Sequence, residues 1–436
     1  MNKISLIILS IAFPITLGWA NDTNLEGKTE EYLIKDLKVI IKQKTTNEIV
    51  SAQLYLRGGS LNLSEVTQGI EPLIFRSAIL NDQKYAEESW EKILEGTGAQ
   101  LGAASGRDFT LIGLRCTLQY FDQLWEVFSD YVMKNAFFDQ VVEVSRDRML
   151  TEIRGLEDSP DVYLRNIAEQ QFYRKHPYRL DPNGTEQTIA RITIEEMTKH
   201  LKDHLKKSRL LLVITGNVSF EDIRTKVENT FGRLSKGNYE PDFPAAVQHD
   251  SARVEIIERD VATNYILGLC SAPSLRDPDY YAMSVAIDIL KWRLFEEIRT
   301  KRNLSYAPDA FLGGNLANYA GVYATSPEPD STVNIILTEM RKLKENHIGA
   351  KDLRDRINMY LTYYYLNNEF NAAQGQFLAQ YELAGISWQE GAKMVDHIRE
   401  VTPEQVQRVA NKYFKNIQFV YLGKPELADR KLFTSM

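Results

Sequence analysis

Two apolar runs decide the architecture of this chain: Leu211-Leu212-Val213-Ile214-Thr215-Gly216 and, near the other end, Phe419-Val420-Tyr421-Leu422-Gly423. Each is a continuous, largely apolar stretch that ends at a glycine, which is typical of a strand buried on both faces of its sheet. Each also closes a similar succession of strand and helix patterns. We therefore predict two halves of one fold, both of α+β class, each with its own sheet and covering helices.

The patterns outward from these runs have a similar order in both halves. Strands alternate apolar and polar residues, helices show the 3.6-residue period, and proline, glycine or a capping residue marks many boundaries. In the first half the predicted strands are 39–44, 50–57, 109–118 and 210–215, and the predicted helices are 69–80, 85–96, 121–134, 138–156, 159–173, one beginning at Thr193, and 219–231. In the second half the predicted strands are 254–258, 265–270, 309–316, 321–326 and 419–423, and the predicted helices are 279–300, 330–345, 350–367, 372–385, 388–400 and one beginning at Thr402.

The boundary between the halves is predicted at residues 236–252, which lack periodicity and hold glycine, two prolines and scattered charges. The domains expected on this basis are residues 21–235 and residues 253–436. Residues 1–20 precede them as a predicted secretory signal.

That signal has a short positive beginning at Lys3, an apolar run over residues 4–17, and small residues at Gly18 and Ala20, so cleavage is expected after Ala20. A membrane anchor is the alternative, but the run of about 14 apolar residues is shorter than the roughly 20 that span a bilayer. No later segment of the sequence is long and apolar enough to cross a membrane. We therefore expect the mature chain to be exported, most simply into a bacterial periplasm.

Composition excludes several classes of protein. Of the 436 residues, 44% are hydrophobic and 25% are charged, as in globular domains and unlike disordered, collagenous or coiled-coil chains. The net charge of −7 does not favour nucleic acid or an anionic membrane as the main partner. Cys116 and Cys270 are too few for a disulfide framework and are expected to be buried in strands, although a bond between them stays open.

The sequence lacks the common motifs of nucleotide binding and serine hydrolysis: there is no G-x-x-x-x-G-K-[ST], no convincing G-x-G-x-x-G and no G-x-S-x-G. Among the histidines, only His200 and His204 have the spacing of two metal ligands on one helix face. No glutamate lies between them to act as a base, and the flanking lysines predict a solvated helix face. We therefore interpret this pair as structural.

Several local signatures resemble the pitrilysin/insulinase family of zinc peptidases. They are Gly58-Gly59-Ser60 with Gly69-Ile70, the stretch from Gly98 to Thr110, His176-Pro177-Tyr178 with Gly184-Thr185, and the stretch from Arg299 to Tyr306. The resemblance extends from about Glu31 to Gly423. It implies a processing-peptidase-like metallohydrolase fold, in which two homologous α/β-sandwich halves face each other across a cleft.

The family binds zinc through an inverted H-x-x-E-H motif, in which two histidines are ligands and the glutamate activates water. Aligned with the family pattern Gly-Leu-Ala-His-Phe-Leu-Glu-His, this chain reads Gly69-Ile70-Glu71-Pro72-Leu73-Ile74-Phe75-Arg76. The resemblance thus places Pro72 and Arg76 at the histidine positions and Phe75 at the base. None of these side chains can bind zinc or accept a proton at neutral pH.

The position of the family's distal glutamate ligand is occupied by Glu152, 76 residues after Arg76. Without the other ligands it is expected to bind no metal and instead to pair with Arg76. Gly102 stands where the family has a substrate-orienting asparagine. The segment from Gly98 to Ser105 would be the strand edge to which substrate adds, with an ordinary strand as the alternative.

The second half keeps the family's Arg/Tyr pair as Arg299 and Tyr306, seven residues apart. In the family this pair grips the substrate backbone and stabilises the tetrahedral oxyanion, a role that suits two hydrogen-bond donors. Without the resemblance, Arg299 would be interpreted as a helix-terminal cation and Tyr306 as a core residue.

The resemblance therefore implies a non-catalytic subunit of an exported zinc metallopeptidase. It would bind no cofactor itself, pair with a metal-bearing homologue that holds the zinc, and contribute Arg299 and Tyr306 to peptide hydrolysis. The alternative is a peptidase-like scaffold or peptide-binding protein with no proteolytic role.

Overall fold

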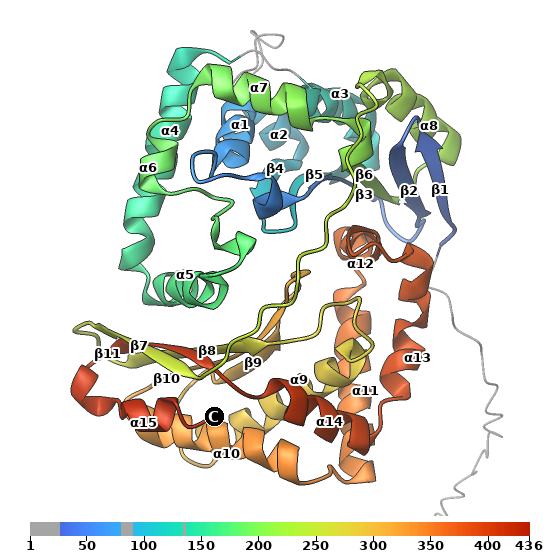
Figure 1. Cartoon of the computed structure of the whole chain (residues 1–436). Coiled ribbons are helices and arrows are strands. Elements are labelled where there is room, and N and C mark those ends of the chain that lie inside the picture. The colour runs from blue at the N-terminus through green and yellow to red at the C-terminus, as the bar shows by residue number, and fades with distance from the viewer. Residues whose placement is uncertain (1–26, 80–89, 134–136) are drawn as a thin grey trace, which may run out of the picture.

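The computed structural model describes residues 27–79, 90–133 and 137–436, which form two sheets in the upper and lower parts of Figure 1. The first sheet has six strands in the order β1-β2-β6-β3-β5-β4, and the second has five in the order β7-β11-β8-β10-β9. The strands of the first sheet are β1 (Thr29–Ile34), β2 (Leu37–Gln43), β3 (Ile49–Arg57), β4 (Gln100–Ser105), β5 (Phe109–Thr117) and β6 (Leu210–Gly216). Those of the second are β7 (Arg253–Glu258), β8 (Asn264–Ser271), β9 (Asp309–Leu312), β10 (Tyr319–Ser326) and β11 (Gln418–Gly423).

The two apolar runs form β6 and β11, and every residue of both strands is buried. β6 lies between β2, to which it is parallel, and β3, to which it is antiparallel. β11 lies in the equivalent place, parallel to β7 and antiparallel to β8. The prediction of two α+β halves of one fold is confirmed.

Helices cover both sheets and separate them from solvent on their outer faces (Figure 1). The first half contributes α1 (Ile70–Ile79), α2 (Trp90–Thr97), α3 (Phe121–Met133), α4 (Asp139–Arg154), α5 (Pro160–Tyr173), α6 (Glu186–Ile189), α7 (Ile194–His204) and α8 (Phe220–Asn229). The second half contributes α9 (Tyr280–Leu294), α10 (Pro329–Glu345), α11 (Ala350–Asn367), α12 (Asn371–Leu383), α13 (Met394–Arg399), α14 (Pro403–Tyr413) and α15 (Arg430–Phe433).

The inner faces of the sheets are covered by helices that the halves exchange. α5, from the first half, packs Leu164 and Ala168 against Leu267 and Val420 of the second sheet. α12, from the second half, packs against the first sheet. The apolar residues of that second contact are Leu378, Ala379 and Leu383 with Ile40, Tyr55, Leu211 and Val213. Each half therefore completes the core of the other.

A glycine allows α12 to approach the first sheet closely. A Cβ atom added at Gly375 would lie 2.7 Å from Oε1 of Gln53 on β3 and 3.1 Å from Oγ1 of Thr215 on β6. The amide of Gln53 donates a hydrogen bond to the carbonyl oxygen of Ala372 at 3.0 Å, close to the start of the same helix. The glycine is thus explained by packing between the halves and not by helix propensity.

The predicted linker, residues 236–252, contains no helix or strand, and β7 begins directly after it. It is held against both halves. His176 Nε2 lies 3.1 Å from the carbonyl oxygen of Ala245, and Val247 is buried among apolar residues of α5 and the second sheet. The segment therefore forms part of the contact between the halves and is not a free tether.

Three predicted elements differ from the observed ones. The helix predicted over 388–400 is a 3₁₀-helix over Trp388–Lys393 and becomes α-helical only in α13. The strand predicted over 309–316 stops at Leu312, because the chain then turns so that the backbone N–H of Leu316 donates to Asp108 of the first half at 3.0 Å. The helix predicted over 279–300 is α-helical to Leu294, and residues Phe295–Thr300 then form a π-helix.

The predicted signal peptide, residues 1–20, lies outside the described residues, as does part of the helix predicted over 85–96. Cys116 and Cys270 are free thiols, each buried in the core of its own half, so the bond that the sequence left open is not formed. Burial raises the pKa of both thiols to about 12. Within the described ranges, no helix has both the length and the apolar character to cross a membrane.

Candidate functional site

The positions aligned with the metal-binding motif lie on α1, which begins directly after Gly69. That glycine has a φ of +83°, a conformation that lets the chain turn sharply into the helix. Pro72 lies in the first turn, where its missing N–H costs no helical hydrogen bond. Pro72 and Phe75 are both buried, and the ring centroid of Phe75 lies 5.9 Å from that of Tyr131. These two positions have therefore become part of the hydrophobic core.

Arg76 is the residue of this motif that faces solvent, and it forms an ion pair with Glu152 of α4. Its Nη1 donates to Oε2 of Glu152 at 2.6 Å, and both side chains are about half exposed. The pair expected from the sequence is present. Because it is exposed, it is worth about 0–1 kcal/mol of folding free energy.

These residues do not fit a zinc ion. A zinc site needs three or four nitrogen, sulfur or carboxylate donors, and here only the Glu152 carboxylate remains, already bound to a cation. Within residues 27–79, 90–133 and 137–436, no three His, Cys, Asp or Glu side chains gather closely enough to hold a metal. The side chains at the aligned positions therefore do not form a zinc site among the described residues.

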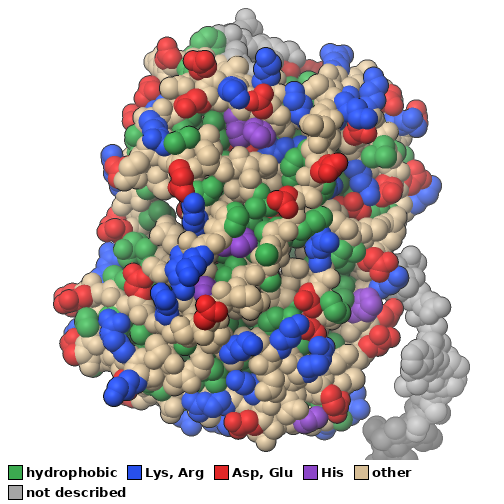
Figure 2. Space-filling view, viewed as in Figure 1, with side chains coloured by type: hydrophobic (Ala, Val, Ile, Leu, Met, Phe, Trp, Pro, Cys, Tyr) green, Lys and Arg blue, Asp and Glu red, His purple; other side chains and the backbone are tan. Residues whose placement is uncertain are grey.

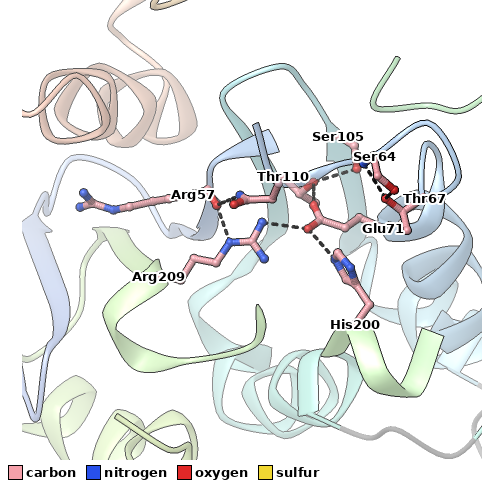
Figure 3. Close-up of polar contacts among 9 residues, drawn as sticks. Arg57, Ser64, Thr67, Glu71, Ser105, Thr110, His200 and Arg209 are labelled. Atoms are coloured by element: carbon pink, nitrogen blue, oxygen red, sulfur yellow. Dashed lines mark hydrogen bonds and ion pairs between the residues drawn. The ribbon is translucent and has the colours of Figure 1, made fainter. Parts of the chain in front are cut away.

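A buried charged cluster lies directly beside the altered motif (Figure 3). The Glu71 carboxylate, on the first turn of α1, accepts from Nη2 of Arg209 at 3.0 Å and lies 3.0 Å from Nε2 of His200. The hydroxyl of Thr110 donates to the second Glu71 oxygen, and it also lies 2.8 Å from the hydroxyl of Ser105. The cluster thus ties α1 to β5, to α7 and to the residue preceding β6.

Glu71 keeps its charge in this setting. Burial acts to raise its pKa, but Arg209, His200 and Thr110 together lower the pKa of Glu71 to about 2. The Arg209 side chain is only 1% exposed, so the carboxylate is its essential counter-charge. No pattern in the sequence predicted this cluster. A carboxylate within an otherwise apolar helix turn, and an arginine directly before a buried strand, were the signals that could have revealed it.

His200 corrects one expectation from the sequence. Instead of lying on a solvated helix face, it is buried with 7% exposure and bonds Glu71. The flanking Lys199 and Lys202 are exposed, as predicted. The His204 ring lies 4.3 Å from the His200 ring, and burial, with nearby His200 and Arg209, lowers the pKa of His204 to about 4. The contact of His200 with Glu71 gives this histidine a structural role in the first half.

Arg299 and Tyr306 lie together and remain accessible. Arg299 is in the π-helical segment that follows α9, and its guanidinium carbon lies 4.3 Å from the centre of the Tyr306 ring and 4.9 Å from that of Phe295. The Tyr306 side chain is 79% exposed, so it is not a core residue. The Arg299 side chain forms no hydrogen bond or ion pair with the residues described in the structure, and its guanidinium N–H groups are free to bind an external acceptor.

Two pockets lie on either side of α5. One, of about 530 Å³, is lined by Arg76 and Glu152. The other, of about 610 Å³, is lined by Arg299 and Tyr306. Val162 and Arg165 of α5 line both pockets. The altered metal motif and the Arg/Tyr pair are therefore neighbours across this helix. Figure 2 shows a hollow on the left of the molecule, near the level of α4 and α5 in Figure 1, bordered by charged side chains.

The strand next to α1 has a free edge. β4 is the last strand of the first sheet, paired only with β5, and most of its residues are at least partly exposed. A Cβ atom at Gly102, in the middle of this strand, would meet nothing within 4 Å. The backbone groups of this edge are therefore available to an extended peptide.

Asp108 holds the two halves together just beyond this edge. Its carboxylate accepts from the hydroxyl of Tyr178 and from the backbone N–H of Leu316 in the second half. Burial raises the pKa of Asp108 to about 6, against the opposing effect of these hydrogen bonds. The signature His176-Pro177-Tyr178 thus has a structural role in this chain, at the contact between the halves.

Comparison with known families places both halves. Residues 38–185 match the family model described as Insulinase (Peptidase family M16), and residues 191–360 match the one described as Peptidase M16 inactive domain.

Similar proteins cover most of the chain at low identity. An "Uncharacterized zinc protease" of Rickettsia felis is 23% identical over 65% of this chain and 70% of its own length. The "Probable mitochondrial-processing peptidase subunit beta, mitochondrial" of Arabidopsis thaliana is 22% identical over 89% of this chain and 76% of its own. "Cytochrome b-c1 complex subunit 1, mitochondrial" of Rattus norvegicus is 21% identical over 58% and 53%.

Two solved structures have the same fold. A protease from Helicobacter pylori superposes with a TM-score of 0.80 at 18% identity, covering 92% of this chain and 100% of that one. A peptidase M16 inactive domain from Pseudomonas fluorescens gives a TM-score of 0.80 at 20% identity, covering 92% and 98%. At these identities the likeness shows the fold alone.

Proposed function

Because the chain belongs to the insulinase family of peptidases, peptidase family M16, and its metal-binding positions hold Pro72, Phe75 and Arg76, we propose that it is a non-catalytic peptidase subunit. It pairs with a homologous chain that carries an intact H-x-x-E-H motif and its zinc. It supplies Arg299 and Tyr306 to the peptide-cleaving site of that partner.

The observation that carries this proposal is the contrast between the two pockets. At the altered motif, Arg76 and Glu152 neutralise each other, and Phe75 is sealed in the core. Around α5, Arg299 is unpaired among the described residues and Tyr306 is exposed beside it. An unpaired guanidinium next to a phenol is suited to stabilise a developing oxyanion. The described residues of this chain hold no metal site that would generate one, so the oxyanion would form at the partner's zinc.

Exposed apolar side chains next to the pair support a partner surface. Phe295 and Trp292 lie one and two turns before Arg299, and both are exposed. The guanidinium of Arg356 on α11 lies 4.9 Å from the Trp292 ring. From Arg356 the exposed residues Met359, Tyr363 and Leu366 continue along α11. Clustered exposed apolar and aromatic residues of this kind mark interfaces between proteins. We therefore assign this surface to the metal-bearing chain.

The test is reconstitution. The chain is purified alone and with a homologous chain from the same genome that has an intact motif. We expect the isolated chain to hold no stoichiometric zinc and to cleave no peptide, and the mixture to co-purify and cleave. Zinc bound at one equivalent to the isolated chain would contradict the proposal. A stable complex that binds peptides without cleaving them would favour a scaffold role, as a subunit of the cytochrome b-c1 complex is among the relatives.

The signal predicted in residues 1–20 adds a proposal on location, which is export to the periplasm together with the partner. Fractionation of cells that express the tagged full-length chain tests it. Recovery in the cytoplasm at full length would contradict export.

A further inference from the structure

The pocket beside Arg299 contains a second unpaired cation, Arg165 of α5. The pocket has two carboxylates, and both are already bound. Asp309 forms an ion pair with Lys291 at 2.8 Å, and Asp161 accepts from the hydroxyl of Tyr323. The Arg165 side chain has neither a hydrogen bond nor an ion pair within the described parts of the chain. The pocket lining thus holds three cationic side chains, Lys291, Arg165 and Arg299, against two carboxylates, which leaves a net charge of +1.

The Arg165 side chain is held in place without using its N–H groups. Its guanidinium carbon lies 5.4 Å from the centre of the Phe311 ring, a cation–π contact with the face of the aromatic ring. A guanidinium held in this way can offer parallel N–H donors to a carboxylate, the geometry in which arginine binds anions best.

Apolar side chains form part of the wall around Arg165. Val162 and Leu164 of α5, Leu267 of β8 and Pro308 line the same pocket. An anion that binds here would therefore be attached to an apolar body, and inorganic anions would gain little from these walls. Arg165 also lines the pocket at Arg76, so it borders both hollows.

We propose that Arg165 is a specificity residue, which selects peptides that carry a carboxylate next to an apolar residue. The carboxylate is the C-terminal group of the peptide or an acidic side chain. The inference rests on the proposed function only in assuming that the peptide enters along Arg299 and Tyr306. Binding to Arg165 requires neither the partner nor zinc.

The experiment measures fluorescence anisotropy of labelled peptides with the purified full chain alone. Three peptides share one apolar sequence: one has a free C-terminal carboxylate, one is C-terminally amidated, and one is amidated with a glutamate beside an apolar residue. We expect the free-acid peptide, the glutamate peptide or both to bind about five- to tenfold more tightly than the plain amide. The peptide whose affinity exceeds that of the plain amide shows which source of carboxylate is recognised.

The variants assign the effect to one side chain. Arg165→Gln is expected to remove the preference, and Arg165→Lys to restore part of it. Arg399→Gln, which removes one exposed charge from α13 outside both pockets, is expected to keep it in full. Equal binding of all three peptides, an undiminished preference in Arg165→Gln, or no binding at about 1 mM protein overturns the inference. In that case the reconstituted mixture could still cleave peptides. Failure of the inference on Arg165 would therefore not contradict the proposed function.

Discussion

Glu71 stands one residue before the altered motif and binds Arg209 and His200 inside the first half. Removing the charge of Glu71 leaves the Arg209 guanidinium buried without a counter-charge. Glu71→Gln is therefore expected to lose about 3–5 kcal/mol of folding free energy. Urea unfolding at pH 7 measures this.

The matched control is Glu152→Gln, which also turns one ion-paired glutamate of the same half into an amide. Its pair with Arg76 is exposed, so the loss is expected to stay below about 1 kcal/mol. If both variants lost the same free energy of unfolding, burial of the Glu71 cluster would not determine how much it contributes to stability.

Acid should weaken the fold through His249, which lies against the Phe172 ring at 5.0 Å near the contact between the halves. Burial, together with Arg174 and Arg253, lowers the pKa of His249 from 6.5 to about 4. Between these values the unfolded chain binds a proton that the folded chain does not, so this residue destabilises the fold as the pH falls from 6.5 to 4.

His249→Gln is expected to show a shallower loss of unfolding free energy over that range than the native chain. Because His204 and Asp108 titrate in both proteins, the difference between the two curves isolates His249. Parallel curves from pH 7 to pH 4 would show that its pKa is not lowered.

At the scale of single residues, the sequence supported the loss of the metal site and the pair of Arg76 with Glu152. It did not reveal that Glu71, Thr110, His200 and Arg209 meet. Those partners lie far apart in the chain, and each alone is compatible with an ordinary exposed position. Periodicity reports which face of an element is apolar, but it carries no information on which distant polar group compensates a buried charge.

Among the elements, α12 depends on close contact with the first sheet. Gly375→Ala should favour the isolated helix by about 1 kcal/mol, but its Cβ would overlap Gln53 and Thr215. Overpacking of this kind costs about 1–3 kcal/mol, so we expect net destabilisation in thermal unfolding. A more stable variant would show that α12 can move away from the sheet without cost.

The exposed stripe of α11 is expected to serve assembly and not folding. The double variant Tyr363→Ser, Leu366→Ser should weaken co-purification with the metal-bearing chain by at least about tenfold in Kd. The unfolding free energy of the isolated chain should change by less than about 0.5 kcal/mol for each exposed site. Unchanged affinity for the partner would show that the interface lies on another surface of the chain.

Most elements could be predicted from the sequence because their apolar periods are strong. β9 ends earlier than predicted because the chain turns to bond Asp108 of the other half. α9 is followed by a π-helix that carries Arg299. π-helical turns often occur at functional sites, and no period in the sequence marks this one.

For the whole molecule, the sequence predicted two homologous halves but not their exchange of α5 and α12. Both helices carry an apolar face, and sequence alone does not say which sheet that face covers. The exchange sets α5 between the two pockets and brings Arg165 of the first half beside Arg299 of the second. The geometry of the candidate site is thus a property of the assembled halves.

The central claim is that this chain lends Arg299 and Tyr306 to a partner that holds the zinc. The most direct measurement is kcat for peptide cleavage by the reconstituted pair, with Arg299→Ala, Tyr306→Phe and, as the control, Arg399→Ala in this chain. Each of the first two variants is expected to lower kcat by about 10²-fold or more while the complex still forms, and the control to leave it unchanged. Full activity of the pair with both substitutions combined would contradict the account.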